Sequence, residues 1–341
     1  DTLDNGGKIH AGADLSIRSG DIDNRGDMLS VGPMVVHSVR DTVNRGAITT
    51  EGHLTIEAHR LANSGRVTSG QGQDIAAASS VDNSGTFHSS ADILLRAEEF
   101  RNGMEGLLQS LGGLSLEVED CLQNLGDLQA GGGINVRSGG SLVNSGGMQA
   151  QSGMELISMA DMVNEGRVHS GGGGSFQSAG ALLNNGEILT MGELLYSGSG
   201  DMRNTGTLHA GGAVRLDLPG DFVNAGDLLS HEQMILAMSG TLNNFGTISS
   251  NEGASISIGG ALYNAAGAEI LAVGGAFFDV TDTLENSGRM EFGGSAAFSV
   301  ANGFINDVQG IVLSAGGLGL HVQHSLDNRG LLHSGASLEL R

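Results

Sequence analysis

Lysine, proline, cysteine and tryptophan are nearly absent from this chain of 341 residues, and their scarcity excludes several classes of protein. Only two prolines accompany 58 glycines, so the sequence is not a collagen, which needs both residues in a strict repeat. The single cysteine, Cys121, cannot form an internal disulfide, and we expect it to be a structural bystander. No apolar run reaches the roughly 18 residues that a membrane-spanning helix needs, so we expect no membrane insertion.

Basic residues are scarce as well. Lys8 is the only lysine, and 16 Lys and Arg stand against 38 Asp and Glu, which gives a formal net charge of −22 at pH 7. A surface this acidic repels the phosphates of nucleic acids and of anionic lipids, so neither is expected as a partner. The apolar share of 39% is too high for a disordered linker. Many glycines with almost no proline indicate β-structure with many tight turns.

An asparagine recurs along the whole chain at a nearly constant interval. Ten of its spacings are 20 residues, three are 19 and three are 22. The 17 copies are Asn5, Asn24, Asn44, Asn63, Asn83, Asn102, Asn124, Asn144, Asn164, Asn184, Asn204, Asn224, Asn244, Asn264, Asn286, Asn306 and Asn328. Because this register never breaks, we expect one continuous domain over residues 1–341, excised from a longer protein.

Apolar residues keep fixed places around each repeat asparagine. The position two residues before it is apolar in 16 of 17 copies, with Thr42 as the exception, and another apolar residue follows by four or six. Farther on, apolar and polar residues alternate, as at Leu54 and Ile56, which indicates strands with one buried face. We therefore predict an all-β fold, a single right-handed parallel β-helix of about 17 coils with 19–22-residue repeats, whose coils bury their apolar faces by stacking.

Glycine follows two residues after the asparagine in 14 copies, as Gly26 follows Asn24. Glycine, and to a lesser degree asparagine, tolerates the left-handed or otherwise strained backbone of a tight turn. Side-chain amides that stack coil over coil can bond to one another, so we predict a structural Asn ladder made of the 17 asparagines. In the three 22-residue copies the two extra residues directly follow the asparagine, so we expect an enlarged turn there and an undisturbed ladder.

The repeat unit reads apolar-x-Asn-x-Gly-x-apolar-x-small-x-Gly-x-apolar-x-apolar. One stretch shows it at Leu142, Asn144, Gly146, Met148, Ala150, Met154 and Leu156. This unit resembles the haemagglutinin repeat of filamentous haemagglutinins and of contact-dependent growth inhibition toxins, and the resemblance covers all 17 copies. It implies a right-handed β-helical filament that leaves the cell by two-partner secretion, through a dedicated outer-membrane pore.

On this resemblance we expect a secreted, non-enzymatic protein of the bacterial cell surface, without a cofactor. It would be the structural shaft of a large filament that presents an adhesive or toxin module to other cells. Its partners would be the outer-membrane secretion pore during export and an unknown receptor on host or neighbouring bacterial cells. The alternatives are an autotransporter passenger β-helix adhesin and, less favoured, a β-helical polysaccharide-degrading enzyme. Such an enzyme would want paired carboxylates in a cleft and clustered basic residues, and this chain has few of the latter.

Two sets of polar residues could form a binding site. Five histidines occupy the same outward slot, namely His10, His88, His169, His209 and His333. No two of them fall in adjacent coils, so no metal site is expected there. The triplet Arg25-Gly26-Asp27, a sequence associated with integrin attachment, lies in an exposed turn and is an adhesion candidate. Arginine fills the same turn position in two other copies, so the triplet can also arise by chance.

Overall fold

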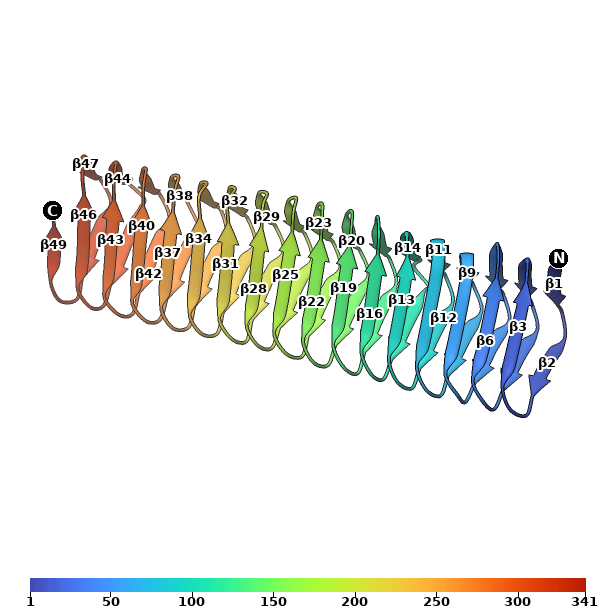
Figure 1. Cartoon of the computed structure of the whole chain (residues 1–341). Helices are drawn as coiled ribbons and strands as arrows, with labels where there is room; N and C mark the ends of the chain where they lie inside the picture. The colour runs from blue at the N-terminus through green and yellow to red at the C-terminus, as the bar shows by residue number, and fades with distance from the viewer. The chain divides into compact units, whose positions relative to one another are not determined.

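The computed structural model describes residues 1–341, and all of its regular elements are β-strands. The chain forms two compact units, residues 1–172 and residues 173–341. Within each unit every strand pairs in parallel with its equivalent about 20 residues along the chain, so the chain winds as a solenoid (Figure 1). The all-β parallel solenoid of about 17 turns is therefore confirmed. That both units belong to one uninterrupted domain stays a prediction.

Each coil contains three short strands, which we call first, second and third in order after a repeat asparagine, and the third ends at the next repeat asparagine. The first strands of unit 1 are β2 (Lys8–Ala11), β5 (Asp27–Ser30), β8 (Ala47–Thr50), β10 (Arg66–Ser69), β12 (Thr86–Ser89), β15 (Leu107–Ser110), β18 (Asp127–Ala130), β21 (Gly147–Ala150) and β24 (Arg167–Ser170). Its second strands are β3 (Leu15–Ser19), β6 (Met34–Ser38), β13 (Ile93–Ala97), β16 (Leu114–Val118), β19 (Ile134–Ser138) and β22 (Met154–Ser158). Its third strands are β1 (Thr2–Asn5), β4 (Asp21–Asn24), β7 (Asp41–Asn44), β14 (Glu99–Asn102), β17 (Leu122–Asn124), β20 (Leu142–Asn144) and β23 (Met162–Asn164). In two coils the second and third strands are joined, as β9 (Leu54–Asn63) and β11 (Gln73–Asn83).

Unit 2 repeats the same coil. Its first strands are β27 (Glu187–Thr190), β30 (Thr207–Ala210), β33 (Asp227–Ser230), β36 (Thr247–Ser250), β39 (Glu269–Ala272), β42 (Arg289–Phe292), β45 (Ile311–Ser314) and β48 (Leu331–Ser334). Its second strands are β25 (Gly174–Ser178), β28 (Leu194–Gly198), β31 (Val214–Leu218), β34 (Met234–Met238), β37 (Ala254–Ile258), β40 (Ala276–Val280), β43 (Ala296–Val300), β46 (Leu318–Val322) and β49 (Leu338–Leu340). Its third strands are β26 (Leu182–Asn184), β29 (Met202–Asn204), β32 (Phe222–Asn224), β35 (Leu242–Asn244), β38 (Leu262–Asn264), β41 (Leu284–Asn286), β44 (Gly303–Asn306) and β47 (Ser325–Asn328).

The core is the inside of the coil, as the alternation of apolar and polar residues predicts. In β16, Leu114 and Leu116 are buried while Glu117 points outward. Equivalent side chains of adjacent coils lie one above the other, and in unit 2 the rings of Phe278 and Phe298 are stacked with their centroids 4.6 Å apart. That distance matches the spacing of paired strands, so stacking the coils also stacks their side chains.

Thr42 interrupts the apolar pattern without leaving a polar atom unpaired. Its side chain is fully buried, and its hydroxyl lies 2.7 Å from the hydroxyl of Ser38 in the same coil. Buried hydroxyls are tolerated when they bond to one another. Thr42, the exception in the sequence, is therefore explained by an internal hydrogen bond and does not mark a surface site.

Coil length varies at two corners only, and both flank the third strand. The 22-residue coils are enlarged directly after the repeat asparagine. The 19-residue coils are one residue shorter between the second and third strands, where two residues separate Ala58 from Leu61 but three separate Ala77 from Val81. The pairing of β9 with β11 shifts register at this point, between Ala77 and Ser80. Strands keep their faces because the length changes are confined to corners.

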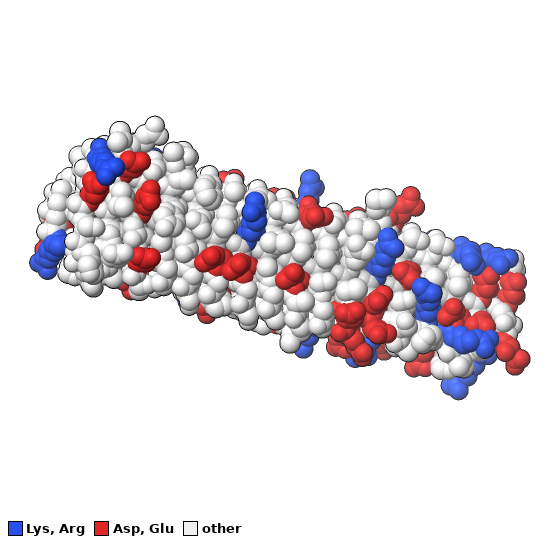
Figure 2. All heavy atoms as spheres, turned by 90° about the horizontal axis from the view of Figure 1, so that it is seen from above, with Lys and Arg blue, Asp and Glu red and all other residues white.

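Charged side chains occupy the outward slots of the strands and the corners (Figure 2). Most of the ion pairs they form join outward positions of neighbouring coils, as Arg96 and Glu117 do at 2.7 Å. These pairs are exposed, so each contributes little to stability. The outer surface is therefore free to vary in sequence while the interior holds the repeat.

Candidate functional site

The repeat asparagines form continuous columns of side-chain hydrogen bonds. In unit 1, from Asn5 to Asn164, each Nδ2 donates to Oδ1 of the next copy at 2.7–2.8 Å. In unit 2, from Asn184 to Asn328, the same bond measures 2.8–2.9 Å. These are normal lengths for an amide hydrogen bond. The ladder is thus a geometric feature of both units.

Each amide in the column before Asn328, the last copy, also donates its second hydrogen. Asn24 Nδ2, for example, bonds to the main-chain oxygen of Ala47 at 3.1 Å, and Asn224 Nδ2 bonds to that of Thr247 at the same distance. The side chains are buried, with 0% of Asn24 and Asn224 exposed. Because the buried donors are used, the buried part of the column leaves no free polar group that could hold a ligand.

The glycine two residues after the asparagine has a different purpose from the one that the sequence suggested. Gly267 is the only residue with a positive φ, so the Asn-x-Gly glycines are not in the left-handed region. Glycine is needed at this position because the backbones of adjacent coils approach each other closely. A Cβ on Gly46 would lie 2.0 Å from the carbonyl oxygen of Gly26 one coil earlier, and one on Gly146 would lie 2.0 Å from that of Gly126. Coils touch backbone to backbone at this corner, and only glycine fits.

The 22-residue coils bulge where the sequence predicts. Asn102 pairs in register with Asn83 on one side and with Asn124 on the other, and Leu108 aligns with Phe87 beyond the insertion. The extra residues project into solvent, since the side chain of Met104 is 83% exposed. The register of Asn264 and of Asn306 with their neighbours is equally undisturbed. The expectation of enlarged turns beside an undisturbed column is confirmed.

The bulges use two different turns. In each, an amide bonds back to the carbonyl three residues earlier, as Gly106 does to Gly103 at 2.8 Å and Ala268 to Ala265 at 3.0 Å. Gly267, the third residue of its turn, has φ 81°, which is typical of a type II turn. The corresponding Glu105 has no positive φ, as a type I turn requires. The bulges therefore share a position but do not share a conformation.

The small residue near the end of each first strand does more than make room for the corner. In most copies where it is Ser or Thr, its hydroxyl bonds to the main chain of the preceding coil, whereas Ser30, Ser69 and Thr190 bond to the main chain of their own coil. Thr50 Oγ1 donates to the carbonyl oxygen of Gly32 at 2.6 Å, and Ser110 Oγ donates to that of Ala91 at the same distance. This hydrogen bond from side chain to main chain was not predicted from the sequence, although the recurrence of Ser and Thr at one position of the repeat indicates it.

The Arg25-Gly26-Asp27 triplet is held within the stack. Arg25 Nη2 pairs with Oδ2 of Asp23 at 2.7 Å. The amides of Gly26 and Asp27 donate to main-chain oxygens of the preceding coil, those of Asn5 and Gly7. The backbone of the triplet is therefore fixed in the stack, while the side chains of Arg25 and Asp27 are exposed, and its role in adhesion stays a hypothesis.

The histidines of the first strands are spread out, as expected. His209 lies between Leu189 and Leu229 in register, so no second histidine is adjacent to it. A different group of possible ligand atoms does come together, in Glu99, Asp120 and Cys121, within 4.8 Å of one another. Burial raises the pKa of the Cys121 thiol, and the charges of Asp120 and Glu99 raise it further, which disfavours the thiolate that a metal needs.

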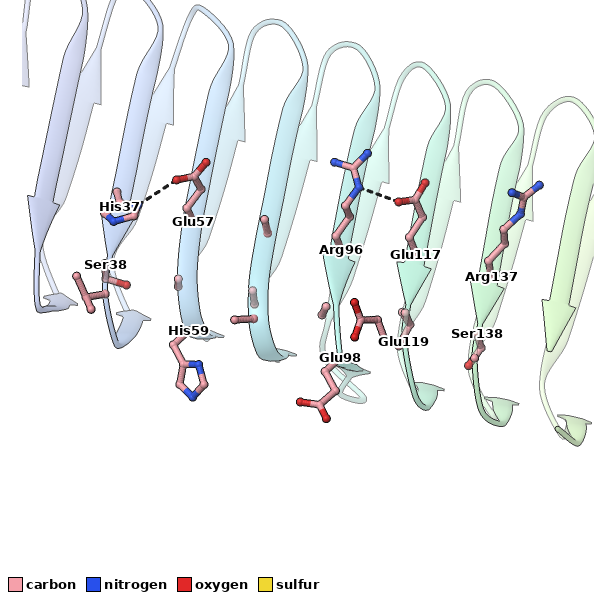
Figure 3. A pocket seen from close by; sticks show the side chains of 18 of the residues that line it. His37, Ser38, Glu57, His59, Arg96, Glu98, Glu117, Glu119, Arg137 and Ser138 are labelled. Carbon is pink, nitrogen blue, oxygen red and sulfur yellow. Dashed lines mark hydrogen bonds and ion pairs between the residues drawn. The ribbon is translucent and has the colours of Figure 1, made fainter. Parts of the chain in front are cut away.

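A groove on unit 1 has a volume of about 940 Å³ (Figure 3). It lies between two rows of outward side chains, both crossing the coils. The first row, on the second strands, includes His37, Glu57, Ala76, Arg96, Glu117, Arg137 and Ile157. The second row, at the corner that follows, includes Val39, His59, Ala78, Glu98, Glu119, Gly139 and Met159. This groove was not predicted from the sequence.

The groove is hollow because one coil has only alanine in both rows. Ala76 and Ala78 of β11 stand where neighbouring coils carry glutamate, arginine or histidine. The floor is made of alanine as well, with Ala58, Ala77 and Ala97 nearly buried. An alignment of the outward positions of all coils would have shown that this coil has small residues at two of them, which indicates the groove.

The charges of the groove leave an acidic excess. His37 Nδ1 lies 3.0 Å from Oε2 of Glu57, and Arg96 is paired with Glu117, as the dashed lines in Figure 3 mark. Glu98 and Glu119 of the corner row form no ion pair. Glu99 and Asp120, which directly follow them in the sequence, add two more carboxylates beside them. The groove can therefore attract cationic groups.

Sequence comparison identifies the repeat. The pattern of the haemagglutinin repeat matches residues 1–58, 36–118, 102–146 and 293–341, more than half of the chain. The chain belongs to the haemagglutinin-repeat family. The unmatched residues 147–292 form coils of the same three strands within each unit, so the same architecture continues there. No curated protein and no solved structure matches the chain. No helix capable of crossing a membrane is found.

Proposed function

We propose that this haemagglutinin-repeat chain is a structural shaft, part of a large secreted filament on a bacterial surface that presents an adhesive or toxin module to other cells. The observation that carries the proposal is the stacking of equivalent coils around the asparagine columns. Each coil contacts only its neighbours and adds about 4.8 Å of length, so the length of the filament grows with the number of coils. Haemagglutinin-repeat proteins are extracellular surface proteins, in keeping with this role.

Export and partners belong to the same proposal. Two-partner secretion through an outer-membrane pore suits a chain whose coils depend only on adjacent coils, because such a chain can fold as it emerges. The receptor would be contacted by the presented module on host or neighbouring bacterial cells. A shaft needs no catalytic group, and we propose that this one is not an enzyme.

The test is to remove whole coils from the exported parent protein. Deleting residues 205–244 takes out two coils and joins Asn204 to Phe245, which keeps the repeat in register. The filament should shorten by about 10 Å, measured by electron cryo-tomography, while target cells are still bound. Deleting residues 205–214 is the control, because half a coil breaks the register and should disrupt the filament. Loss of target-cell binding with the filament otherwise intact after the 40-residue deletion would show that the coils themselves are the active module.

A further inference from the structure

We propose that the groove of unit 1 binds an extended basic peptide, a segment of a partner polypeptide about nine residues long. Lysine or arginine would lie at the centre of this segment and apolar residues at its ends. This binding function is separate from that of a shaft, and it rests on the shape, charge and lining of the groove.

The length of the groove sets the length of the ligand. It extends from the coil of Val39 to the coil of Met159, which are six coil steps apart. At about 4.8 Å per step the groove is about 29 Å long. An extended polypeptide covers about 3.3 Å per residue, so about nine residues fill it.

The charge of the groove selects a basic ligand. Glu98 and Glu119 lie in adjacent coils on the corner row and have no basic partner of their own, and Glu99 and Asp120 strengthen the negative potential beside them. Basic side chains spaced along an extended peptide can reach both unpaired glutamates. Polyanions are repelled, and so is a second copy of this chain, whose formal net charge is −22.

The lining favours a peptide over a sugar. Alanine methyl groups form the floor, and exposed apolar side chains stand at the two ends, where 70% of Val39 and 64% of Met159 are accessible. No Phe, Tyr or Trp ring, the usual stacking partner of a sugar, lines the groove. Apolar surface with a few charged groups is the usual make-up of a ligand site.

Irregularities of the repeat coincide with the groove. β9 and β11 run through the corner as single long strands, and their register shift lies at its floor. Gln73, which is also in β11 but does not line the groove, takes a buried place that is mostly aliphatic in other coils. Departures from a consistent pattern concentrate where a protein has a function other than stability.

The experiment measures binding to the purified 341-residue chain by fluorescence anisotropy. The probe is a fluorescein-labelled nonapeptide with three central Lys and Arg residues and Val and Leu at both ends. The double variant Glu98→Gln/Glu119→Gln should weaken its binding at least tenfold. Ala76→Phe, which fills the groove without changing any charge, should weaken it to a similar extent, and thermal unfolding verifies that both variants fold.

A matched pair of carboxylates separates site binding from general attraction. Glu232 and Glu252 are exposed, lie one coil apart in unit 2 and are far in sequence from the groove. Glu232→Gln/Glu252→Gln should change the affinity less than twofold. An equal loss in this control, unchanged binding by Ala76→Phe, or no binding of the peptide to the unmodified chain would overturn the proposal. Tighter binding of an acidic nonapeptide, of a heparin hexasaccharide or of a neutral hexasaccharide would overturn it as well.

Discussion

Nδ2 of Asn102 donates to Oδ1 of Asn124 at 2.8 Å, although this coil is two residues longer than most. The bond between Asn124 and Asn144, which are 20 residues apart, is nearly the same length at 2.7 Å. The asparagine column is therefore the fixed reference of the coil, and length changes are accommodated outside it.

The column should be a major source of stability, and β35 contains its own control. Asn244 is fully buried in the ladder, whereas its neighbour Asn243 points outward. Asn244→Ala would leave the partners in both adjacent coils unpaired, so we expect the free energy of unfolding to fall by about 2 to 4 kcal/mol. Asn243→Ala should change it by less than about 0.5 kcal/mol. If chemical denaturation gave equal effects for the two variants, the ladder bonds of Asn244 would not stabilise the fold.

The glycines of the Asn-x-Gly turn should be required for space and not for φ. A Cβ on Gly146 meets the backbone oxygen of Gly126 at 2.0 Å, but one on Gly103 has no neighbour nearer than 3.4 Å. We expect Gly146→Ala to cost about 1 to 3 kcal/mol because two coils must separate. Gly103→Ala should be nearly neutral. Thermal unfolding of the two variants decides this, and a neutral Gly146→Ala would contradict the close approach.

The bulge after Asn102 should be dispensable. Removing Met104 and Glu105 leaves Asn102-Gly103-Gly106, which is the ordinary Asn-x-Gly turn, and returns Leu108 to its usual distance from the asparagine. Because loop closure depends weakly on length, stability should change by less than about 1 kcal/mol. Deleting Gln129 alone, in β18, should be far more damaging, since it turns the residues after it to the wrong face. The denaturation midpoints of the two deletions should therefore differ clearly.

Asp21 should give one acid-dependent contribution to stability. Arg40 Nε donates to Asp21 Oδ1 at 3.0 Å, and this hydrogen bond lowers the pKa of Asp21 from 3.8 to about 2. A pKa that is lower in the folded chain means that the pair stabilises the fold above about pH 4 and is lost as the pH falls toward 2. Arg40→Gln should raise the pKa of Asp21 toward 3.8 in an NMR titration. Arg18→Gln, which removes an arginine without touching Asp21, should leave it unchanged.

The interior could be predicted from the sequence, because one asparagine and a few apolar slots recur at fixed distances. That regularity gave the strands, the coil, the ladder and the position of the bulges after Asn102, Asn264 and Asn306. The reason for the glycines could not be predicted, since the distance between Gly46 and Gly26 exists only after the coils are stacked. The groove could not be predicted either, because it arises from the contrast between Ala76 and Ala78 and the larger residues of other coils.

The spacing of the repeat also determines the sequence separation between residues that must come into contact during folding. The bonds of the ladder join residues 19 to 22 positions apart. Against a length of 341 residues, this gives a relative contact order of about 0.06, below the roughly 0.16–0.22 of most all-β domains and comparable with helical bundles. Each new coil needs only the next 20 or so residues and the edge of the coil before it. A purely β-stranded protein can thus form by local, sequential growth, without the slow long-range pairing that usually limits β-sheets.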